Sequence, residues 1–178
     1  MPAAEEIEIR RLTSQDASAY YGVRLESLEQ EPLAFSSSPE EHRALTLGEI
    51  ARRLGSSPED RSFVLAAFVD DAIVGVAGFF QEEGPKCRHR GRIWGVYVTQ
   101  KWRRKGIARV LLTEIIERTR RHPELEQILL AVGATQTAAR QLYASLGFEV
   151  YARDTRAIRV GSTYVDEDLM VLRLEEGR

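Results

Sequence analysis

Apolar and polar residues change their spacing along this chain in a way that predicts alternating strands and helices. Residues 7–12 alternate apolar and polar side chains, as a half-buried strand does, and residues 16–29 carry apolar side chains at helical spacing. Residues 40–54 repeat the helical spacing after a Ser-Pro pair, which favours a helix start. The chain therefore opens with one strand and two predicted helices.

An antiparallel meander is predicted next. Residues 62–69 and 72–80 are apolar runs on either side of the acidic turn Asp70-Asp71, and residues 92–98 supply a third strand. Gly95 lies inside that third strand, where a glycine weakens pairing and usually marks a bulge or the close approach of a ligand. The alternative is a glycine tolerated beneath a bulky neighbour.

The clearest helix of the chain follows Gly106 and ends at His122-Pro123. Residues 127–132 then form a continuous apolar run, which is typical of a strand covered on both faces. A strand, a helix and a second strand in this order imply that residues 92–98 and 127–132 are parallel neighbours.

The end of the chain predicts one short helix and two strands. The helix covers about residues 137–146 and is followed by Gly147, where a left-handed cap belongs. Residues 148–157 and 164–174 form the closing strands. No repeat, low-complexity tract or linker interrupts this order, so we expect one domain.

Composition excludes several classes of protein. The chain has 178 residues, of which 43% are hydrophobic, and its net charge of -2 argues against a general nucleic-acid binder. Cys87 is the single cysteine, and no apolar stretch approaches the roughly 20 residues of a membrane span. Residues 1–6 lack the basic and apolar pattern of a signal peptide, so we expect a cytoplasmic protein. The three histidines are far apart, and we expect no metal site.

A cluster of cations stands where the third strand of the meander gives way to the long helix. Arg103, Arg104 and Lys105 precede a helix N-terminus, which itself presents unpaired N–H groups and a partial positive charge. A phosphate bound there would turn this repulsion into attraction, and Gly106 would let the backbone approach it. The alternative is a solvated basic turn. The two common glycine-rich nucleotide-binding motifs are absent from this segment.

Two motifs resemble those of the GCN5-related N-acetyltransferase (GNAT) family. Arg103-x-x-Gly106-x-Ala108, preceded by a strand ending in Tyr97-Val98, resembles the family's pyrophosphate-binding motif. The segment from Gln136 to Phe148 is similar to the second motif, Asn-x-x-Ala-x-x-Leu-Tyr-x-x-x-Gly-Phe, in all but its first position. The departure at Gln136 puts one expected coenzyme contact in question.

The resemblance implies a fold and a cosubstrate. The expected fold is α+β: a single N-acetyltransferase domain over residues 1–178, with a mixed, mostly antiparallel seven-stranded sheet, about four helices, and parallel, splayed fourth and fifth strands. The implied cosubstrate is acetyl-CoA, without a metal. The residues that the resemblance assigns to coenzyme binding are Val96, Val98, Arg103, Arg104, Lys105, Gly106, Ile107, Ala108, Arg109, Gln136, Ala139 and Tyr143.

The resemblance also assigns chemical roles. The backbone groups of Val96 and Val98 would pair with the pantetheine arm and polarise the thioester carbonyl. Tyr143 would protonate the departing thiolate, which is plausible because a phenol pKa of about 10 lies near a thiol pKa of about 8.5. The alternative for Tyr143 is a half-buried aromatic residue on an amphipathic helix.

The acceptor side is less well defined. Glu31, Phe35 and Trp94 are the candidate acceptor residues, and the loop of residues 33–38 is expected to form a wall of the acceptor pocket. Many relatives carry a glutamate on the strand occupied here by residues 92–98, but this chain has none there. The candidate bases are Glu31, Glu41, Glu82 and Asp166, each of which could instead be a solvated carboxylate.

The resulting hypothesis is an acetyl-CoA-dependent N-acetyltransferase that acts on a small-molecule amine by direct attack in a ternary complex. One alternative is acetylation of a protein N-terminus or lysine, which needs an open groove. Another is a non-catalytic acyl-CoA binding or sensing domain. We expect no nucleic-acid or membrane partner, and the resemblance implies a homodimer through the last strands.

Overall fold

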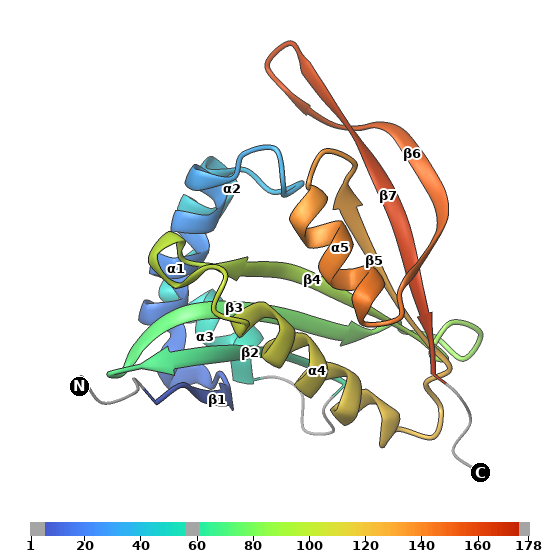
Figure 1. The fold of residues 1–178 in the computed structure, drawn as a ribbon. Coiled ribbons are helices and arrows are strands. Elements are labelled where there is room, and N and C mark those ends of the chain that lie inside the picture. The colour runs from blue at the N-terminus through green and yellow to red at the C-terminus, as the bar shows by residue number, and fades with distance from the viewer. Residues whose placement is uncertain (1–5, 56–60, 175–178) are drawn as a thin grey trace.

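The computed structural model describes residues 6–55 and 61–174, so most of the N-terminal stretch considered above for a signal peptide lies outside it. Seven strands form one sheet (Figure 1). The strands are β1 (Glu8–Arg11), β2 (Ser62–Val69), β3 (Ala72–Gln81), β4 (Arg90–Val98), β5 (Gln127–Gly133), β6 (Glu149–Val160) and β7 (Thr163–Arg173). The α-helices in the described ranges are α1 (Ala17–Gln30), α2 (Pro39–Arg43), α3 (Leu47–Gly55), α4 (Ile107–Arg120) and α5 (Thr137–Ser145). Short 3-10 helices cover Ser14–Asp16 and Gln100–Trp102.

The sheet has the strand order β1-β2-β3-β4-β5-β7-β6. All neighbouring strands are antiparallel except β4 and β5, which are parallel. Asp70 and Asp71, with φ angles of 47° and 64°, form the tight turn between β2 and β3. The α+β fold expected from the sequence, with a mixed seven-stranded sheet, is confirmed.

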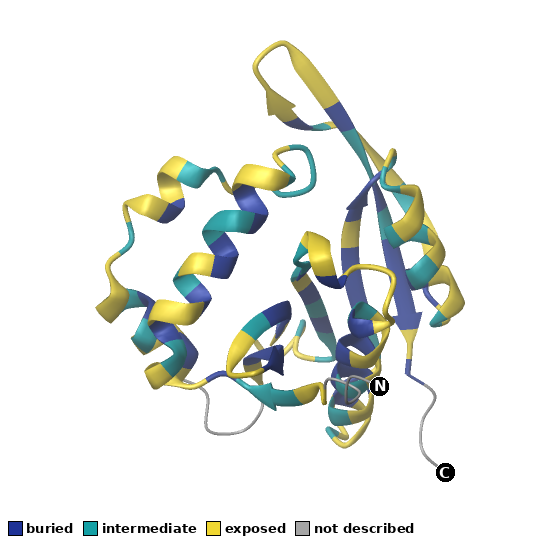
Figure 2. Ribbon diagram, turned by 60° about the vertical axis from the view of Figure 1, so that its left-hand side comes forward, coloured by how far each residue is buried: buried dark blue, intermediate teal, exposed yellow. Residues whose placement is uncertain are grey.

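Two apolar cores cover the two faces of the sheet. Alternate side chains of β2 direct Leu65 and Ala67 to one face and Val64 and Ala66 to the other. The first face packs against α4 and α5, and the second against α1 and α3 (Figure 1). Figure 2 shows that burial is concentrated along the strands, whereas the tip of the β6–β7 hairpin is exposed.

The single helix predicted over residues 40–54 is wrong, because the chain forms α2 and α3 there. The first helix ends at Arg43 with Ala44 as its C-cap, and Thr46 caps the second: its hydroxyl accepts the Glu49 backbone N–H, and the Glu49 carboxylate accepts the Thr46 N–H at 2.7 Å. This reciprocal capping box favours a new helix start over a continuous helix. The described part therefore has five α-helices in place of the expected four.

The remaining elements lie within a few residues of their predicted positions. Gly147 has a φ of 94° and caps the end of α5 in the left-handed conformation, as the sequence predicts. Across residues 6–55 and 61–174, every helix falls short of the length and apolar character that crossing a membrane demands.

Candidate active site

β4 contains a bulge at the predicted glycine. Val76 of β3 faces Tyr97 and Gly78 faces Trp94, so β4 has one residue more than β3 between these two pairs. Gly95 adopts a φ of 63°, a left-handed conformation that favours glycine. The bulge is the physical reason for the glycine that the sequence places inside an otherwise regular strand.

β4 and β5 separate soon after they begin. The two strands pair at Arg90, Gly91 and Arg92 of β4, and no strand pairs with β4 on its β5 side from Ile93 onward in the described structure. A cleft of about 460 Å³ opens there, lined by β4, β5, α5 and the start of α4. The open edge of β4 offers backbone donors and acceptors to an extended ligand, as an added strand would use them.

The cation-rich loop is shaped by two left-handed residues before α4. Arg104 has a φ of 62° and Gly106 a φ of 83°. A Cβ added to Gly106 would meet no atom within 4 Å, so the glycine is required by its backbone conformation and not by crowding. No side chain caps α4 and its first turn carries no acidic residue, so its N–H groups remain available to an anion.

Arg103 is held by the protein itself. Its Nε donates to the Val98 carbonyl at 3.0 Å, and its Nη1 pairs with Glu31 Oε1 at 2.8 Å. The guanidinium also lies 5.5 Å from the centre of the Tyr97 ring. Glu31 thereby connects the end of α1 to the cation-rich loop, a contact that the sequence did not predict.

The other cations of this loop have different positions. Lys105 lies 4.0 Å from the centre of the Trp102 ring and does not line the cleft, unlike the other eleven residues assigned to the coenzyme. Arg109 lines the cleft and donates to Ser145 Oγ at 2.8 Å, which joins α4 to α5.

Tyr143 lies on α5 and lines the inner wall of the cleft. Its side chain is 7% exposed and packs edge-on against Phe148, with ring centres 6.0 Å apart. Burial raises the pKa of its hydroxyl, so the phenol stays protonated at neutral pH. Within the described residues, the hydroxyl makes no hydrogen bond and remains free to donate to a ligand.

The α1–α2 loop and the start of α5 meet at one end of the cleft. A Cβ placed on Gly133 would lie 3.2 Å from Gln136 Cγ and 3.7 Å from the Leu33 carbonyl oxygen. Glu31 and Phe35 of this loop line the cleft together with Gln136, Ala139 and Trp94. The structure thus brings the three predicted acceptor residues beside the predicted coenzyme residues.

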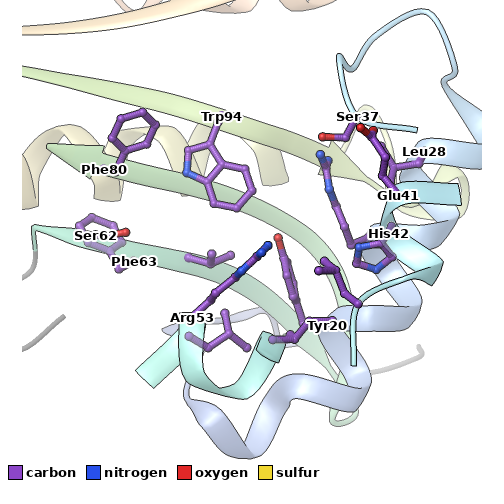
Figure 3. Close-up of a pocket in the computed structure, with 15 residues that line it drawn as sticks. Tyr20, Leu28, Ser37, Glu41, His42, Arg53, Ser62, Phe63, Phe80 and Trp94 are labelled. Atoms are coloured by element: carbon purple, nitrogen blue, oxygen red, sulfur yellow. The ribbon is translucent and has the colours of Figure 1, made fainter. Parts of the chain in front are cut away.

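A second cavity of about 600 Å³ lies between the sheet and the helices α1, α2 and α3. Figure 3 shows Trp94 and Phe80 on the sheet, with Tyr20, His42 and Arg53 facing them from the helices. Trp94 lines both this cavity and the β4–β5 cleft. The tryptophan therefore forms the boundary between the two spaces.

The candidate carboxylate bases all have partners. Glu82 pairs with Arg90 and Arg92 at 2.8 Å, and Asp166 accepts the Arg156 backbone N–H at 2.8 Å. Glu41 lines the second cavity, where it accepts the Ser38 backbone N–H, and Glu31 pairs with Arg103 as described above. Neither Glu82 nor Asp166 lines the cleft or the second cavity.

Two residues in the second cavity were missed by sequence reasoning. His42 is buried, and its Nε2 lies 3.1 Å from the Tyr21 carbonyl oxygen. Burial lowers the pKa of His42, so its ring is neutral at pH 7. Arg24 is buried on α1 and lines the same cavity. Neither belongs to a short motif; only the spacing of buried positions along α1 could have indicated Arg24.

Among the described residues, no group of three or more His, Cys, Asp or Glu side chains could hold a metal ion.

Comparison with known proteins gives one family match. A family model described as the acetyltransferase (GNAT) family matches residues 23–148.

Two curated proteins are similar to parts of the chain. L-amino acid N-acetyltransferase AaaT of Escherichia coli (strain K12) is 26% identical over 102 residues, which cover 57% of this chain and 62% of that protein. A mycothiol acetyltransferase of Brachybacterium faecium is 29% identical over 145 residues, covering 80% of this chain and 40% of that protein. The matches thus span less than two thirds of either relative.

One of the similar solved structures contains acetyl-CoA. A candidate acetyltransferase of Salmonella typhimurium, yncA, was solved with its cofactor acetyl-CoA and matches with a TM-score of 0.79 at 22% identity. The match covers 96% of this chain and 95% of that one. At this level of identity, the comparison shows a shared fold.

Proposed function

The chain belongs to the acetyltransferase (GNAT) family, and we propose that it transfers an acetyl group from acetyl-CoA to a primary amine of a small molecule. The observation that carries the proposal is the β4–β5 cleft. It joins an open strand edge, an uncapped helix N-terminus and the protonated Tyr143 hydroxyl within one space of about 460 Å³. The amine would attack directly, in a ternary complex.

The residues of the cleft fit the chemistry of acetyl-CoA. The free N–H groups at the start of α4, with Arg104 beside them, suit the pyrophosphate. The unpaired backbone edge at Val96 and Val98 suits the amide groups of pantetheine. When bound, acetyl-CoA would supply an acyl group activated as a thioester.

We assign proton donation to Tyr143. Burial raises the pKa of Tyr143 and keeps its hydroxyl protonated, and the same burial disfavours a free thiolate, so the departing sulfur needs a proton. The hydroxyl can therefore donate to the sulfur as negative charge develops there.

The acceptor amine must lose a proton, since most amines are protonated at pH 7. Of the titratable groups that line the second cavity, His42 is kept neutral by burial and can accept a proton.

A small-molecule acceptor is supported by the shape of the second cavity. Residues of three helices and the sheet line this space, and its volume of about 600 Å³ suits a small molecule. The two curated relatives are named for L-amino acids and for mycothiol, both of them small molecules.

Thiol release from acetyl-CoA with a panel of primary amines and short peptides tests the proposal. Replacing Tyr143 by Phe should lower kcat by at least about tenfold, with the coenzyme Kd retained, because general acids contribute roughly 10²–10⁴ to rate. Tyr151→Phe, which alters a tyrosine that is 51% exposed on β6, is the matched control and should leave kcat unchanged. Coenzyme binding without turnover on any acceptor would contradict the proposal and favour a binding or sensing domain.

A further inference from the structure

Arg24 is a buried cation without a carboxylate partner. Its side chain is 9% exposed, and it lies on the buried face of α1 with Tyr20 and Leu28. Its one hydrogen bond within the described structure is long, from Nη1 to Ser27 Oγ at 3.4 Å. Burial lowers the pKa of its guanidinium, which shows how unfavourable this position is for the charge.

The carboxylates nearest to Arg24 in the chain are engaged elsewhere. Glu26 accepts the Tyr97 hydroxyl at 2.8 Å, Glu29 pairs with Arg43, and Glu31 pairs with Arg103 at 2.8 Å. Glu41, which lines the same cavity, accepts the Ser38 backbone N–H at 2.7 Å. The protein therefore leaves the Arg24 charge without a carboxylate partner, although several carboxylates lie on the elements around it.

Among the described residues, Asp168 is the other buried side chain that is ordinarily charged, and it has partners. Asp168 is fully buried, and both Arg140 and Arg153 pair with it at 2.7 Å. A buried ion without a partner is costly, so a protein that retains one usually has a use for its charge.

Arg24 lies between the β4–β5 cleft and the second cavity. Its guanidinium carbon lies 4.7 Å from the Phe35 ring centre and 6.0 Å from that of Trp94. Its Nη1 would lie 3.6 Å from a Cβ on Gly95, the bulge residue next to Val96. Since Phe35 and Gly95 line the cleft and Trp94 lines both spaces, the charge lies where an acceptor would enter the cleft.

We propose that Arg24 binds the carboxylate of the acceptor and that the acceptor is an α-amino acid. This inference rests on the proposed acetyltransferase function. In an α-amino acid the amine is two bonds from the carboxyl carbon, so a carboxylate on Arg24 places the amine beside Gly95 and the open edge of β4. A guanidinium suits this role because its planar fork can donate two parallel hydrogen bonds to one carboxylate.

The second cavity indicates which side chain the amino acid carries. More of its wall is apolar than polar, with Leu28, Leu45, Ile50, Leu54, Phe80 and Trp94 among the apolar residues and Glu41, His42 and Arg53 among the polar ones. A large aliphatic or aromatic side chain would bury apolar surface there, whereas a charged one would lose hydration. L-Phenylalanine and L-leucine are therefore the preferred probes.

Matched acceptors that differ only in the carboxylate test the proposal. We expect kcat/KM for L-phenylalanine to exceed that for phenethylamine by at least about tenfold. In Arg24→Met, kcat/KM for L-phenylalanine should fall roughly tenfold to a hundredfold, the loss expected for hydrogen bonds to a charged group, while phenethylamine changes less than about threefold. Arg24→Lys should restore part of the preference. Arg52→Met, which alters an exposed arginine of α3, is the control.

A binding measurement gives an answer independent of turnover. Calorimetry of the CoA-loaded protein should show N-acetyl-L-phenylalanine binding more tightly than N-acetylphenethylamine, and Arg24→Met should abolish the difference. Equal use or equal binding of the members of each pair would overturn the inference while leaving the acetyltransferase proposal intact. So would a preference lost in Arg53→Met but kept in Arg24→Met. Arg24-dependent binding without acetylation of any amine would instead overturn the proposed function.

Discussion

Replacement of Gly78 by alanine should disturb the acceptor cavity by displacing Trp94. A Cβ on Gly78 would lie 2.3 Å from Trp94 Cε2 and 2.6 Å from both Cζ2 and Nε1. Carbon atoms pack at about 3.5–4.0 Å, so the indole must move by more than roughly 1 Å. The ring is already 37% exposed, which gives it room to rotate outward and away from the strand.

The magnitude follows from the surface that the indole would lose. A tryptophan buries about 150–250 Å², and loss of half of that contact at about 25 cal/mol per Å² corresponds to roughly 2–3 kcal/mol. This agrees with the usual cost of overpacking, about 1–3 kcal/mol. We therefore expect Gly78→Ala to lower the free energy of unfolding by about 2 kcal/mol and to raise the acceptor KM.

Urea denaturation followed by circular dichroism measures the stability, and the thiol-release assay measures the acceptor KM. Gly22→Ala is the control, because it makes the same chemical change in α1 at a position where no atom lies within 4 Å. That variant should be more stable by about 0.5–1 kcal/mol, since alanine favours a helix. A Gly78→Ala protein within about 0.5 kcal/mol of the parent, with an unchanged KM, would refute the packing of Trp94 on Gly78.

Two further predictions concern ion pairs. Glu31→Gln removes a partly exposed partner of Arg103, and it should tighten coenzyme binding about twofold to fivefold at low salt and less at high salt, as measured by calorimetry; weaker binding at low salt would contradict this. The hydrogen bonds from Arg10 lower the pKa of Asp16 from 3.8 to about 2, so this pair stabilises the fold above pH 4 and the contribution is lost as pH falls towards 2. Asp16→Asn should therefore lower the free energy of unfolding at pH 7 by about 1–2 kcal/mol, after allowance for solvent screening. In urea titrations, the free energy of unfolding of this variant should fall less between pH 4 and pH 2 than that of the parent. An equal fall in the two proteins would count against the pairing.

The sequence predicted those parts of the site that depend on neighbouring residues in the chain. The loop before α4 was predictable because the cations, Gly106 and the first apolar residues of the helix are consecutive in the chain. The bulge at Gly95 was indicated by a glycine inside a strand of β-branched and aromatic residues. These signals are local because backbone conformation is set largely by adjacent residues.

Contacts between distant residues could not be predicted in this way. The pairing of Glu31 with Arg103 joins two segments that meet only in the folded chain. Because the guanidinium of Arg103 already pairs with a carboxylate, it is less available to a phosphate than the sequence predicted. Arg24 resembles any charged residue on an amphipathic helix until the fold closes Phe35 and Trp94 around it. The split between α2 and α3 had a local signal, the Thr46 and Glu49 capping box, but the continuous apolar spacing concealed it.

The short pairing between β4 and β5 also determines how the sheet can bend. These strands share three residue pairs, whereas β2 and β3 share eight and β5 and β7 share seven. The strands on either side of this junction come from consecutive parts of the chain, residues 8–98 and residues 127–173. We therefore expect the sheet to bend most easily at this junction. A molecule in the cleft would touch residues of both β4 and β5, so we expect binding to restrict this bending.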